Sequence, residues 1–354
     1  MSFPQIYFGT LGLAFVGDRL GLWHHSGKSC WDSFPAADSI KNFSLPESSA
    51  NLVLFALVVL VPTLAVWRWF WKTVVFSKLA EICMGKGAAH GKFTEQAWLA
   101  LHYAMVTLLG YWVLKDKPWW APIVTRQAMN APLQERMKDQ QDLGLQALYA
   151  TQLAFYMLEL GTLVLEAKTR KRSDVVVYFF HHIYTVVLMA GSWVTWSHRI
   201  GSLVLILHDV GDIFLPIGKC FTYAEQHVKQ TCSRRTFQLV QFLGIFFFVL
   251  FIVAFAVPRI LTFGGLIYFT AYELDWTTCC GEMVNAAGVC VGGVGATACP
   301  APFFIGLLVC VLMLLWPMHV FWMWLIIKMA AKVVFGQYQD VRSDDEGEEE
   351  KKKA

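Results

Sequence analysis

The sequence is short of charge. Asp, Glu, Lys and Arg together make up only 16% of its 354 residues, whereas 56% are hydrophobic and 15% are aromatic. Soluble globular domains usually carry about 25% charged residues. This shortage argues against a soluble globular protein and favours a chain that crosses a membrane several times. The 15 Trp residues agree with that interpretation, because Trp concentrates at membrane interfaces.

The sequence also lacks the repeated histidine boxes, of the form His-x-x-His-His, on which membrane di-iron hydroxylases and desaturases depend. Of its 10 histidines, only His181 and His182 form a pair inside an apolar segment of membrane length. The other pair, His24 and His25, precedes the first such segment. A metal site would have to be small and assisted by carboxylates, so we expect neither a metal ion nor a bound cofactor.

Apolar segments of membrane-spanning length recur along the chain. A helix needs about 20 predominantly apolar residues to cross the hydrocarbon core. Seven segments meet this requirement: Asn51 to Trp71, Gln96 to Leu114, Leu145 to Leu165, Val175 to Trp196, Ile200 to Phe221, Phe237 to Val257 and Pro302 to Met329. We therefore predict an all-α polytopic membrane protein with about seven transmembrane helices. The stretch from Ile6 to Val16 is shorter and is predicted to be interfacial or a short anchor.

The connections between these segments indicate an orientation. Lys and Arg are in excess on one side, which predicts a lumenal amino terminus and a cytosolic carboxyl terminus. The only Asn-x-Ser/Thr sequon makes Asn42, before the first segment, a candidate glycosylation site on the lumenal side. The chain closes with an acidic run and then Lys351-Lys352-Lys353-Ala354. That ending resembles a dilysine retrieval signal of endoplasmic reticulum membrane proteins, although a random basic tail is the alternative.

A Gly-rich connection before the last segment is rich in cysteine. Its members are Cys279, Cys280, Cys290 and Cys299. In the predicted topology this connection is lumenal, and an oxidising lumen permits disulfides. The pairing does not follow from the sequence, and unpaired thiols remain the alternative.

Ionisable side chains interrupt two consecutive apolar segments. His181 and His182 lie in the fourth segment, and His208, Asp209 and Asp212 lie in the fifth. Charged groups at membrane depth are costly, so they indicate a functional site and are expected to satisfy one another across a helix pair. The connection between the two segments is short, which makes them antiparallel neighbours with these groups at similar depth.

Helical spacing refines the arrangement of these groups. On one helix, Asp212 is placed to face either His208, four residues before it, or Asp209, three residues before it. His181 and His182 point about 100° apart, so they are expected to have different roles. Small residues in the fifth segment, Gly201 and Gly211, would allow neighbouring helices to approach closely.

Further polar residues lie at a similar level in other segments. Candidate substrate-binding residues are Tyr156, Glu159, His319 and Arg199, and the second segment adds His102 and Tyr103. The alternative for Glu159 is a structural hydrogen-bond partner. For His102 and His319 it is a packing role with satisfied ring nitrogens.

A histidine supported by a carboxylate suits acyl transfer. The carboxylate fixes the imidazole tautomer and stabilises the imidazolium that forms. No Ser or Cys nucleophile has a comparable placement in this sequence. The histidine can deprotonate an incoming amine or alcohol, or it can attack a thioester and form an acyl-imidazole, and the sequence does not choose between the two.

These motifs resemble a known family. The segment from Lys171 to Cys220, with Phe180-His181-His182-Ile183 and Leu207-His208-Asp209-x-x-Asp212, is similar to the Lag motif of ceramide synthases, which have a TLC domain. The resemblance extends to Asp116-Lys117-Pro118-Trp119, to the segment from Tyr156 to Leu160, and to His319-Val320-Phe321-Trp322. It covers the chain from about Trp98 to its end.

The resemblance implies a TLC-type helical barrel or bundle in the endoplasmic reticulum membrane. It implies transfer of a fatty acyl chain from acyl-CoA, the co-substrate, to the amine of a sphingoid base. His181, His182, Asp209 and Asp212 match the essential residues of the family. Within that set, we expect His181 to be the acyl-accepting or acid/base imidazole, with Asp212 orienting it, His182 and His208 supporting it, and Asp209 receiving the substrate ammonium. The alternative is a non-catalytic TLC protein that binds, transports or senses lipid.

The predicted domain organisation follows from these assignments. It consists of a lumenal segment (1–50), a first span with a cytosolic connection (51–94), a catalytic TLC membrane domain (95–335) and an acidic cytosolic tail (336–354). The short connection after the first span leaves no room for the homeobox-like domain of many animal members, so the chain resembles the fungal, plant or protist branch. Expected partners are long-chain acyl-CoA, a sphingoid base, membrane lipid and a second subunit, either in a homo- or heterodimer or as a small regulatory protein. No nucleic acid is expected.

Overall fold

The structure is a computed structural model that describes residues 47–85, 89–120, 133–166, 175–273 and 302–334. These residues form helices and turns, without a β-strand among them. Seven helical segments are long and apolar enough to cross a membrane: Asn51–Met84, His90–Leu114, Leu143–Leu165, Val176–Val194, His198–Thr231, Arg234–Ala271 and Gly306–Val333. The predicted fold class and the predicted number of spans are therefore confirmed.

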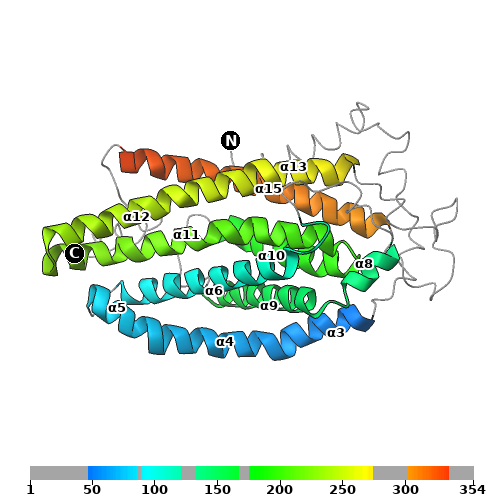
Figure 1. Cartoon of the computed structure of the whole chain (residues 1–354), viewed down its shortest axis with the longest axis horizontal. Coiled ribbons are helices and arrows are strands. Elements are labelled where there is room, and N and C mark those ends of the chain that lie inside the picture. The colour runs from blue at the N-terminus through cyan, green and yellow to red at the C-terminus, as the bar shows by residue number, and fades with distance from the viewer. Residues whose placement is uncertain (1–46, 86–88, 121–132, 167–174, 274–301, 335–354) are drawn as a thin grey trace.

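The helices run roughly along one axis and form an elongated bundle (Figure 1). The first span is a continuous curved run made of α3 (Glu47–Phe55), η1 (Ala56–Leu60), α4 (Val61–Phe70), η2 (Trp71–Phe76) and α5 (Ser77–Met84), where η marks π-helical turns. The remaining elements are α6 (His90–Leu114), α8 (Leu133–Asp139), α9 (Leu143–Glu166), α10 (Val175–Val194), α11 (His198–Thr231), α12 (Arg234–Phe255), η3 (Ala256–Thr262), α13 (Phe263–Tyr268), η4 (Phe269–Glu273) and α15 (Pro302–Val334).

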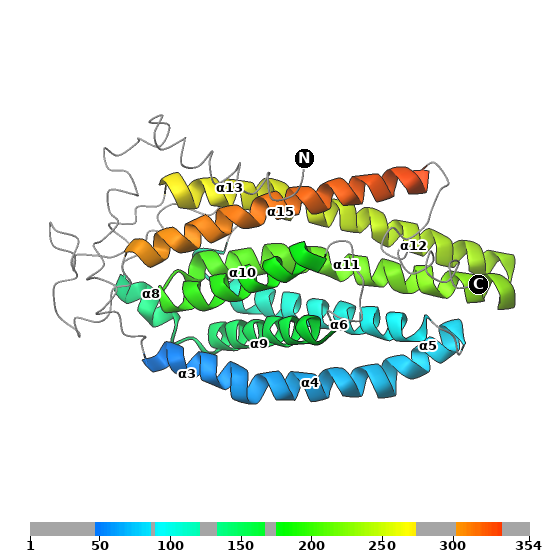
Figure 2. The same cartoon turned by 180° about the vertical axis from the view of Figure 1, so that it is seen from behind.

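The α11 helix lies at the centre of the bundle. It packs mainly along α12 and α6, whereas α10 packs against α9 and α15. Figure 2 shows this order from behind, with α15 on one side of the α10–α11 layer and α9 on the other. The tight turn after α10 keeps α10 and α11 adjacent, but each helix also has its own neighbours. Polar groups on α10 and α11 can therefore find partners on α9, η3 and α15 as well as on each other.

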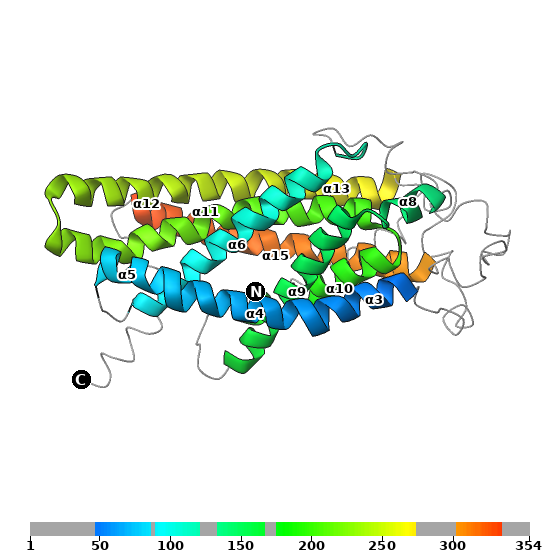
Figure 3. The ribbon, with the colours of Figure 1, turned by 60° about the horizontal axis from the view of Figure 1, so that its bottom comes forward.

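The α11 helix is longer than the sequence indicated. It has 34 residues, about 50 Å of helix, and continues ten residues beyond the expected end at Phe221. A hydrocarbon core is about 30 Å thick, so a helix of this length exceeds it. Figure 3 shows the α11–α12 hairpin reaching beyond α5 at this end of the bundle. Buried apolar side chains from α5 and α6, such as Met84 and Phe93, pack there against Ala224 and Val228 of α11. This packing stabilises the extension.

Two glycines allow α11 to approach its neighbours closely, as the sequence predicted. A Cβ at Gly201 would lie 2.1 Å from the Tyr149 hydroxyl, and one at Gly211 would lie 2.9 Å from the Ala254 carbonyl oxygen. Contacts shorter than 3 Å would force the backbone or the neighbour to move. Gly211 therefore lets the end of α12 lie directly against the part of α11 that carries Asp209 and Asp212.

The turn between α10 and α11 is clamped by α8. Trp196, which belongs to the turn, has a φ of 53°, a left-handed conformation that is strained for a large side chain. The Arg136 Nη1 donates to the Trp196 carbonyl oxygen at 3.2 Å, and the Gln140 Nε2 donates to the Trp193 carbonyl oxygen at 2.5 Å. These bonds fix the beginning of α11 and, through the rigid helix, the register of His208.

Candidate functional site

Four histidines from three helices gather inside the bundle. His181 and His182 come from α10, His208 from α11 and His319 from α15, and all four are buried. The His181 ring centroid lies 5.6 Å from that of His182, 6.4 Å from that of His208 and 6.0 Å from that of His319. The predicted partners on α10 and α11 therefore meet, and α15 supplies a fourth imidazole to the same cluster.

Hydrogen bonds define the tautomers of two of these rings. The His208 Nδ1 lies 2.6 Å from the Val204 carbonyl oxygen, and the His182 Nδ1 lies 2.9 Å from the Tyr178 carbonyl oxygen. A carbonyl oxygen only accepts, so each Nδ1 carries the hydrogen and donates. In the neutral ring, Nε2 is then the basic nitrogen. In both α10 and α11, an imidazole is thus held in place by its hydrogen bond to the backbone carbonyl oxygen one helical turn before it.

His319 completes this chain of hydrogen bonds. Its Nε2 lies 3.1 Å from the Nε2 of His208. Because His208 already donates through Nδ1 to a carbonyl, its neutral ring accepts at Nε2, and His319 must be the donor. The His319 Nδ1 is then a lone-pair nitrogen, buried and without a partner. His319 is therefore part of the polar cluster rather than a packing residue remote from it.

His181 lies between the other three imidazoles and an aromatic side chain. The edge of its ring meets the Trp322 ring, with centroids 5.0 Å apart. Its Nδ1 is buried and has no hydrogen-bond partner. A ring nitrogen that the protein leaves unsatisfied in this way is available to a substrate or to a proton.

The two carboxylates have partners outside the histidine cluster. Asp209, which is fully buried, accepts a hydrogen bond from Gln152 of α9. The Oδ2 of Asp212 forms an ion pair with the Nη2 of Arg259 in η3 at 2.6 Å, and that Nη2 also donates to the His208 carbonyl oxygen at 2.6 Å. The expectation that the His and Asp side chains would satisfy one another was therefore incomplete. The Arg259 guanidinium and the Gln152 amide, from two further elements, also interact with the two carboxylates.

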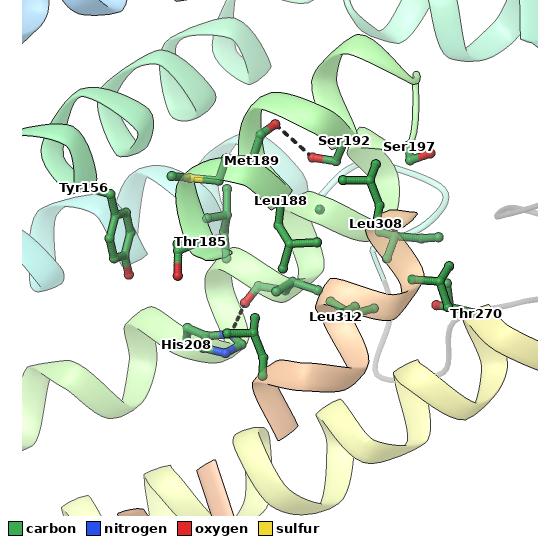
Figure 4. A pocket seen from close by; sticks show the side chains of 16 residues that line it. Tyr156, Thr185, Leu188, Met189, Ser192, Ser197, His208, Thr270, Leu308 and Leu312 are labelled. Atoms are coloured by element: carbon green, nitrogen blue, oxygen red, sulfur yellow. Dashed lines mark hydrogen bonds between the residues drawn. The ribbon is translucent and has the colours of Figure 1, made fainter. Parts of the chain in front are cut away.

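Tyr156 links the cluster to a pocket. Its ring meets that of His182 edge to face at 5.6 Å, and its side chain is within electrostatic range of both Asp209 and Asp212. Tyr156 and His208 line one end of a pocket between α10, α11 and α15 (Figure 4). The remaining lining is mostly apolar, and includes Leu188, Leu308 and Leu312.

The pocket leads from His208 toward the α10–α11 turn. Ser197, at its far end, precedes His208 by eleven residues, which corresponds to about 16 Å along the helix axis. Thr270 of η4 and Leu308 of α15 lie at the same far end (Figure 4). An apolar pocket of this length, with an imidazole at one end, is suited to an extended alkyl chain whose reacting atom lies beside the histidines.

Comparisons with known proteins match this chain over most of its length. The family model described as TLC domain (TRAM_LAG1_CLN8) matches residues 92–328, more than half of the chain. Ceramide synthase 1 LOH3 of Arabidopsis thaliana is 30% identical over 264 residues, which are 73% of this chain and 75% of that protein. The chain belongs to the ceramide synthase family.

Two further similar proteins match the chain to a comparable extent. Ceramide synthase 3 of Mus musculus is 30% identical over 72% of this chain, although the match spans only 56% of the mouse protein. ASC1-like protein 1 of Oryza sativa subsp. japonica is 27% identical over 87% of this chain and 90% of that protein. The TLC match contains all four histidines and both carboxylates of the cluster.

Two candidate residues of this ceramide synthase family member lie apart from the cluster. The Oε1 of Glu159 forms an ion pair with the Nη1 of Arg68 in the first span at 2.7 Å, and Arg68 also binds Glu95 of α6 at 2.6 Å. Arg199 is nine residues, or about 14 Å of helix, before His208. Its guanidinium binds Asp139 and Glu135 of α8 and stacks on the Trp119 ring. The candidates Glu159 and Arg199 thus join helices in the described structure.

The structure adds two residues that the sequence interpretation had missed. The sixth segment predicted from the sequence ends at Val257, which leaves Arg259 in the following connection, and Gln152 is not among the predicted site residues. A signal existed for both, because each lies inside an apolar segment: Gln152 in Leu143–Leu165, and Arg259 in Arg234–Ala271. His102, a polar residue that the sequence had indicated in the second span, stacks on Phe155 of α9 with ring centroids 3.6 Å apart.

Some predictions concern residues outside the described parts of the chain. Asn42 and the four cysteines Cys279, Cys280, Cys290 and Cys299 belong to this group. Within the ranges that the structure does describe, no group of three or more His, Cys, Asp or Glu side chains is arranged to hold a metal ion.

Proposed function

We propose that this protein is a ceramide synthase that transfers a fatty acyl chain from acyl-CoA to the amine of a sphingoid base. Membership of the ceramide synthase family supports the reaction class. The observation that carries the proposal is the cluster of His181, His182, His208 and His319 with Asp209 and Asp212 beside an apolar pocket. Such a cluster offers bases, a nucleophile and negative charge next to a site for an alkyl chain.

The reaction requires few groups from the protein. A carbon–nitrogen bond forms between the amine and the acyl carbon while the carbon–sulfur bond of the thioester breaks. The substrate amine arrives mainly as an ammonium ion and must lose a proton before it attacks. A second proton leaves the nitrogen as the amide forms, and a proton reaches the departing thiolate. A neutral imidazole with a basic ring nitrogen can accept the proton from the amine and return it to the sulfur.

Each buried group has a proposed role in that sequence. His181, with a ring nitrogen that has no partner, is the imidazole that takes the proton or the acyl group. His182 and His208, each held by a backbone carbonyl, stabilise the charge that develops. The Asp209 carboxylate receives the ammonium of the sphingoid base. Asp212, paired with Arg259, helps to orient the site.

A single assay tests the proposal. The purified protein in detergent or lipid nanodiscs is given a series of acyl-CoA chain lengths with sphinganine, and both released CoA and the amide product are measured. We expect CoA release that depends on sphinganine, together with a product of the mass of dihydroceramide. The His181→Ala variant should lose turnover while keeping normal expression. The Asp212→Asn variant should also lose turnover, with a lower thermal unfolding temperature because Arg259 loses its ion-pair partner. Near-normal rates in both variants would refute the site assignment.

The second candidate is a TLC-domain protein that binds, transports or senses lipid without chemistry. The pocket favours lipid binding under either proposal, so binding alone does not separate them. Saturable binding of sphinganine with no CoA release at any chain length would exclude the acyltransferase and support this alternative.

The role of His181 is open to a direct chemical test. If the imidazole attacks the thioester, acyl-CoA alone should leave an acyl group on a peptide that contains His181, detectable by mass spectrometry. If His181 acts only as a general base, no adduct should form in the absence of sphinganine. The His181→Ala protein is the control for acylation at other residues.

We further propose that the enzyme acts in the endoplasmic reticulum membrane with its amino terminus in the lumen. The basic connections and the resemblance of the last four residues to a retrieval signal support this orientation. Digestion with a glycosidase should increase the mobility of the wild-type protein on a gel but leave the Asn42→Gln protein unchanged. No shift in either protein would contradict the lumenal assignment.

A further inference from the structure

A stripe of polar side chains runs along the buried side of α9. Tyr149, Gln152, Tyr156 and Glu159 recur at intervals of three, four and three residues, which places them on one face of the helix. Each has a different partner. Tyr149 donates to the His198 carbonyl oxygen at 3.0 Å, and Glu159 binds Arg68. Gln152 is the member of this stripe that touches a carboxylate of the candidate site.

Gln152 and Asp209 form a polar contact in the core of the bundle. Both are fully buried. The Gln152 Nε2 donates to the Asp209 Oδ2 in a short hydrogen bond. The Gln152 Oε1 interacts with the His102 imidazole. The Asp209 Oδ1, by contrast, is buried and has no hydrogen-bond partner in the protein. Buried polar atoms of native proteins are nearly always satisfied, so this carboxylate oxygen indicates a donor that the protein itself does not supply.

The charge around Asp209 leads to the same conclusion. Of the two carboxylates, Asp212 has the direct ion pair with Arg259, whereas the hydrogen bond to Asp209 comes from the neutral amide of Gln152 and Arg259 acts on it only through space. A buried carboxylate without a cation in direct contact is costly, and an amide orients the charge without neutralising it. The missing partner should therefore be a cation with several N–H donors, which is the chemistry of a primary ammonium group.

We propose that Gln152 is a positioning residue for Asp209. By occupying Oδ2, its amide holds the carboxylate in one orientation and leaves Oδ1 for the ammonium of the amine substrate. Gln152 should therefore govern affinity for the sphingoid base and have little influence on the acyl donor. This inference rests on the proposed acyl transfer, because it assigns the amine of that reaction to Asp209.

The test is steady-state kinetics on the full-length Gln152→Met protein. Methionine nearly preserves the side-chain volume but cannot donate a hydrogen bond, so packing is retained while Asp209 loses its hydrogen bond from Gln152. Because hydrogen bonds to charged groups are stronger than neutral ones, we expect the KM for sphinganine to rise at least about tenfold. The KM for acyl-CoA should change less than about twofold. Any acylation of the enzyme, or CoA release in the absence of sphinganine, should be unaffected.

A matched control removes another hydrogen bond from the same face of α9. Tyr149→Phe deletes a buried hydroxyl that binds the α10–α11 turn and has no contact with Asp209. It should lower the thermal unfolding temperature without raising the KM for sphinganine relative to that for acyl-CoA. If both variants raise the two KM values together, Gln152 is only structural and the inference is wrong.

Gln152→Asn covers the case in which methionine prevents folding. Asparagine keeps the amide but shortens the side chain, so the bond to Asp209 lengthens and the KM for sphinganine should again rise selectively. An unchanged KM in either folded variant would overturn the role of Gln152 but leave the proposed function intact. Absence of turnover in the wild-type protein would instead refute the proposed function.

Discussion

Arg259 binds both Asp212 and the backbone of the helix that carries it. One guanidinium nitrogen, Nη2, lies 2.6 Å from the Asp212 Oδ2 and 2.6 Å from the His208 carbonyl oxygen. The guanidinium also stacks on the Phe255 ring, 4.8 Å from its centroid. Arg259 thus compensates the charge of Asp212, binds the α11 backbone at His208, one turn before Asp212, and is itself positioned by the Phe255 ring. Its side chain connects the π-helical turn η3 to the catalytic candidates on α11.

We expect Arg259→Met to destabilise the protein and abolish turnover. Removal of one partner from a buried ion pair leaves an uncompensated charge and typically costs about 3–5 kcal/mol. The expected result is a clearly lower thermal unfolding temperature in detergent together with loss of CoA release. Arg234→Met is the matched control, because Arg234 lies exposed at the start of α12. It should leave stability and turnover close to those of the wild type.

The double variant Arg259→Met/Asp212→Asn separates charge compensation from chemistry. Neutralising both partners removes the unpaired charge, so the double variant should be more stable than Arg259→Met alone. Turnover should not return, because the carboxylate is still missing. Strict additivity of the two losses of stability would contradict the ion pair as the cause.

His319 should be essential because of the hydrogen that it donates to His208. Since the His208 Nδ1 is committed to the Val204 carbonyl oxygen, His319 is the donor in the 3.1 Å contact between the two Nε2 atoms. We expect His319→Phe, which retains an aromatic ring, to reduce kcat at least about tenfold with little change in thermal stability. His319→Gln should recover part of the rate, because its amide can donate. Normal kcat in His319→Phe would return His319 to a packing role.

The sequence predicted the seven spans and the polar residues of α10 and α11 because both depend on composition along a single helix. A charged group in an apolar segment is visible without a structure. Which side chain faces that group is not visible in the same way, since it depends on how several helices pack. Helical spacing placed Asp212 within reach of His208 and Asp209, but its ion-pair partner comes from η3, 47 positions later in the chain. Neither composition nor periodicity could identify that pairing.

The sequence did not indicate Arg259 and Gln152 as site residues, for two physical reasons. Pro258 and Arg259 looked like the end of the sixth span, yet the π-helical turn η3 carries the helix past them to Glu273. The proline is tolerated because the altered hydrogen-bond pattern of a π-helical turn replaces the regular one. Gln152 was not predicted because its amide is neutral, and charged side chains and histidines were used as the main sign of a site. A buried amide is nevertheless costly without a hydrogen-bond partner.

Asp139 should make a contribution to stability that depends on pH. This residue, in α8 outside the membrane-spanning segments, binds Arg199 at 2.7 Å and lies 3.6 Å from His198. Burial raises the pKa of its carboxyl, but the nearby His198 imidazole and the hydrogen bond from Arg199 together outweigh burial and hold the pKa below its usual value. A carboxyl whose pKa is lower in the folded state stabilises the fold at pH values above its unfolded pKa, near 3.9, and loses that contribution as the pH falls through the folded value.

The Asp139→Asn protein is therefore expected to unfold at a lower temperature than the wild type at pH 7. The difference between the two should remain down to about pH 4 and shrink below it. Thermal unfolding in detergent between pH 7 and pH 3 provides the measurement. Asp116→Asn is the control, since the Asp116 side chain is 85% exposed and should not matter at either pH. A difference that is the same at pH 7 and pH 3 would argue against the charged form of Asp139 as its source.

The far end of the pocket should set the preferred acyl length. Leu308 of α15 lines that end and packs tightly against α10, where a Cβ on Gly191 would lie only 2.4 Å from its Cδ2. Leu308→Ala would extend the pocket away from the histidines. One methylene in an apolar pocket changes kcat/KM by about 10- to 200-fold, so the variant should favour longer acyl-CoA substrates by at least about tenfold relative to the wild-type preference. Competition between acyl-CoA species of different lengths, with the products resolved by mass spectrometry, measures this ratio.

Leu307→Ala is the matched control, because the neighbouring Leu307 is 46% exposed and does not line the pocket. If both variants keep the wild-type length preference, the acyl chain does not reach this end of the pocket.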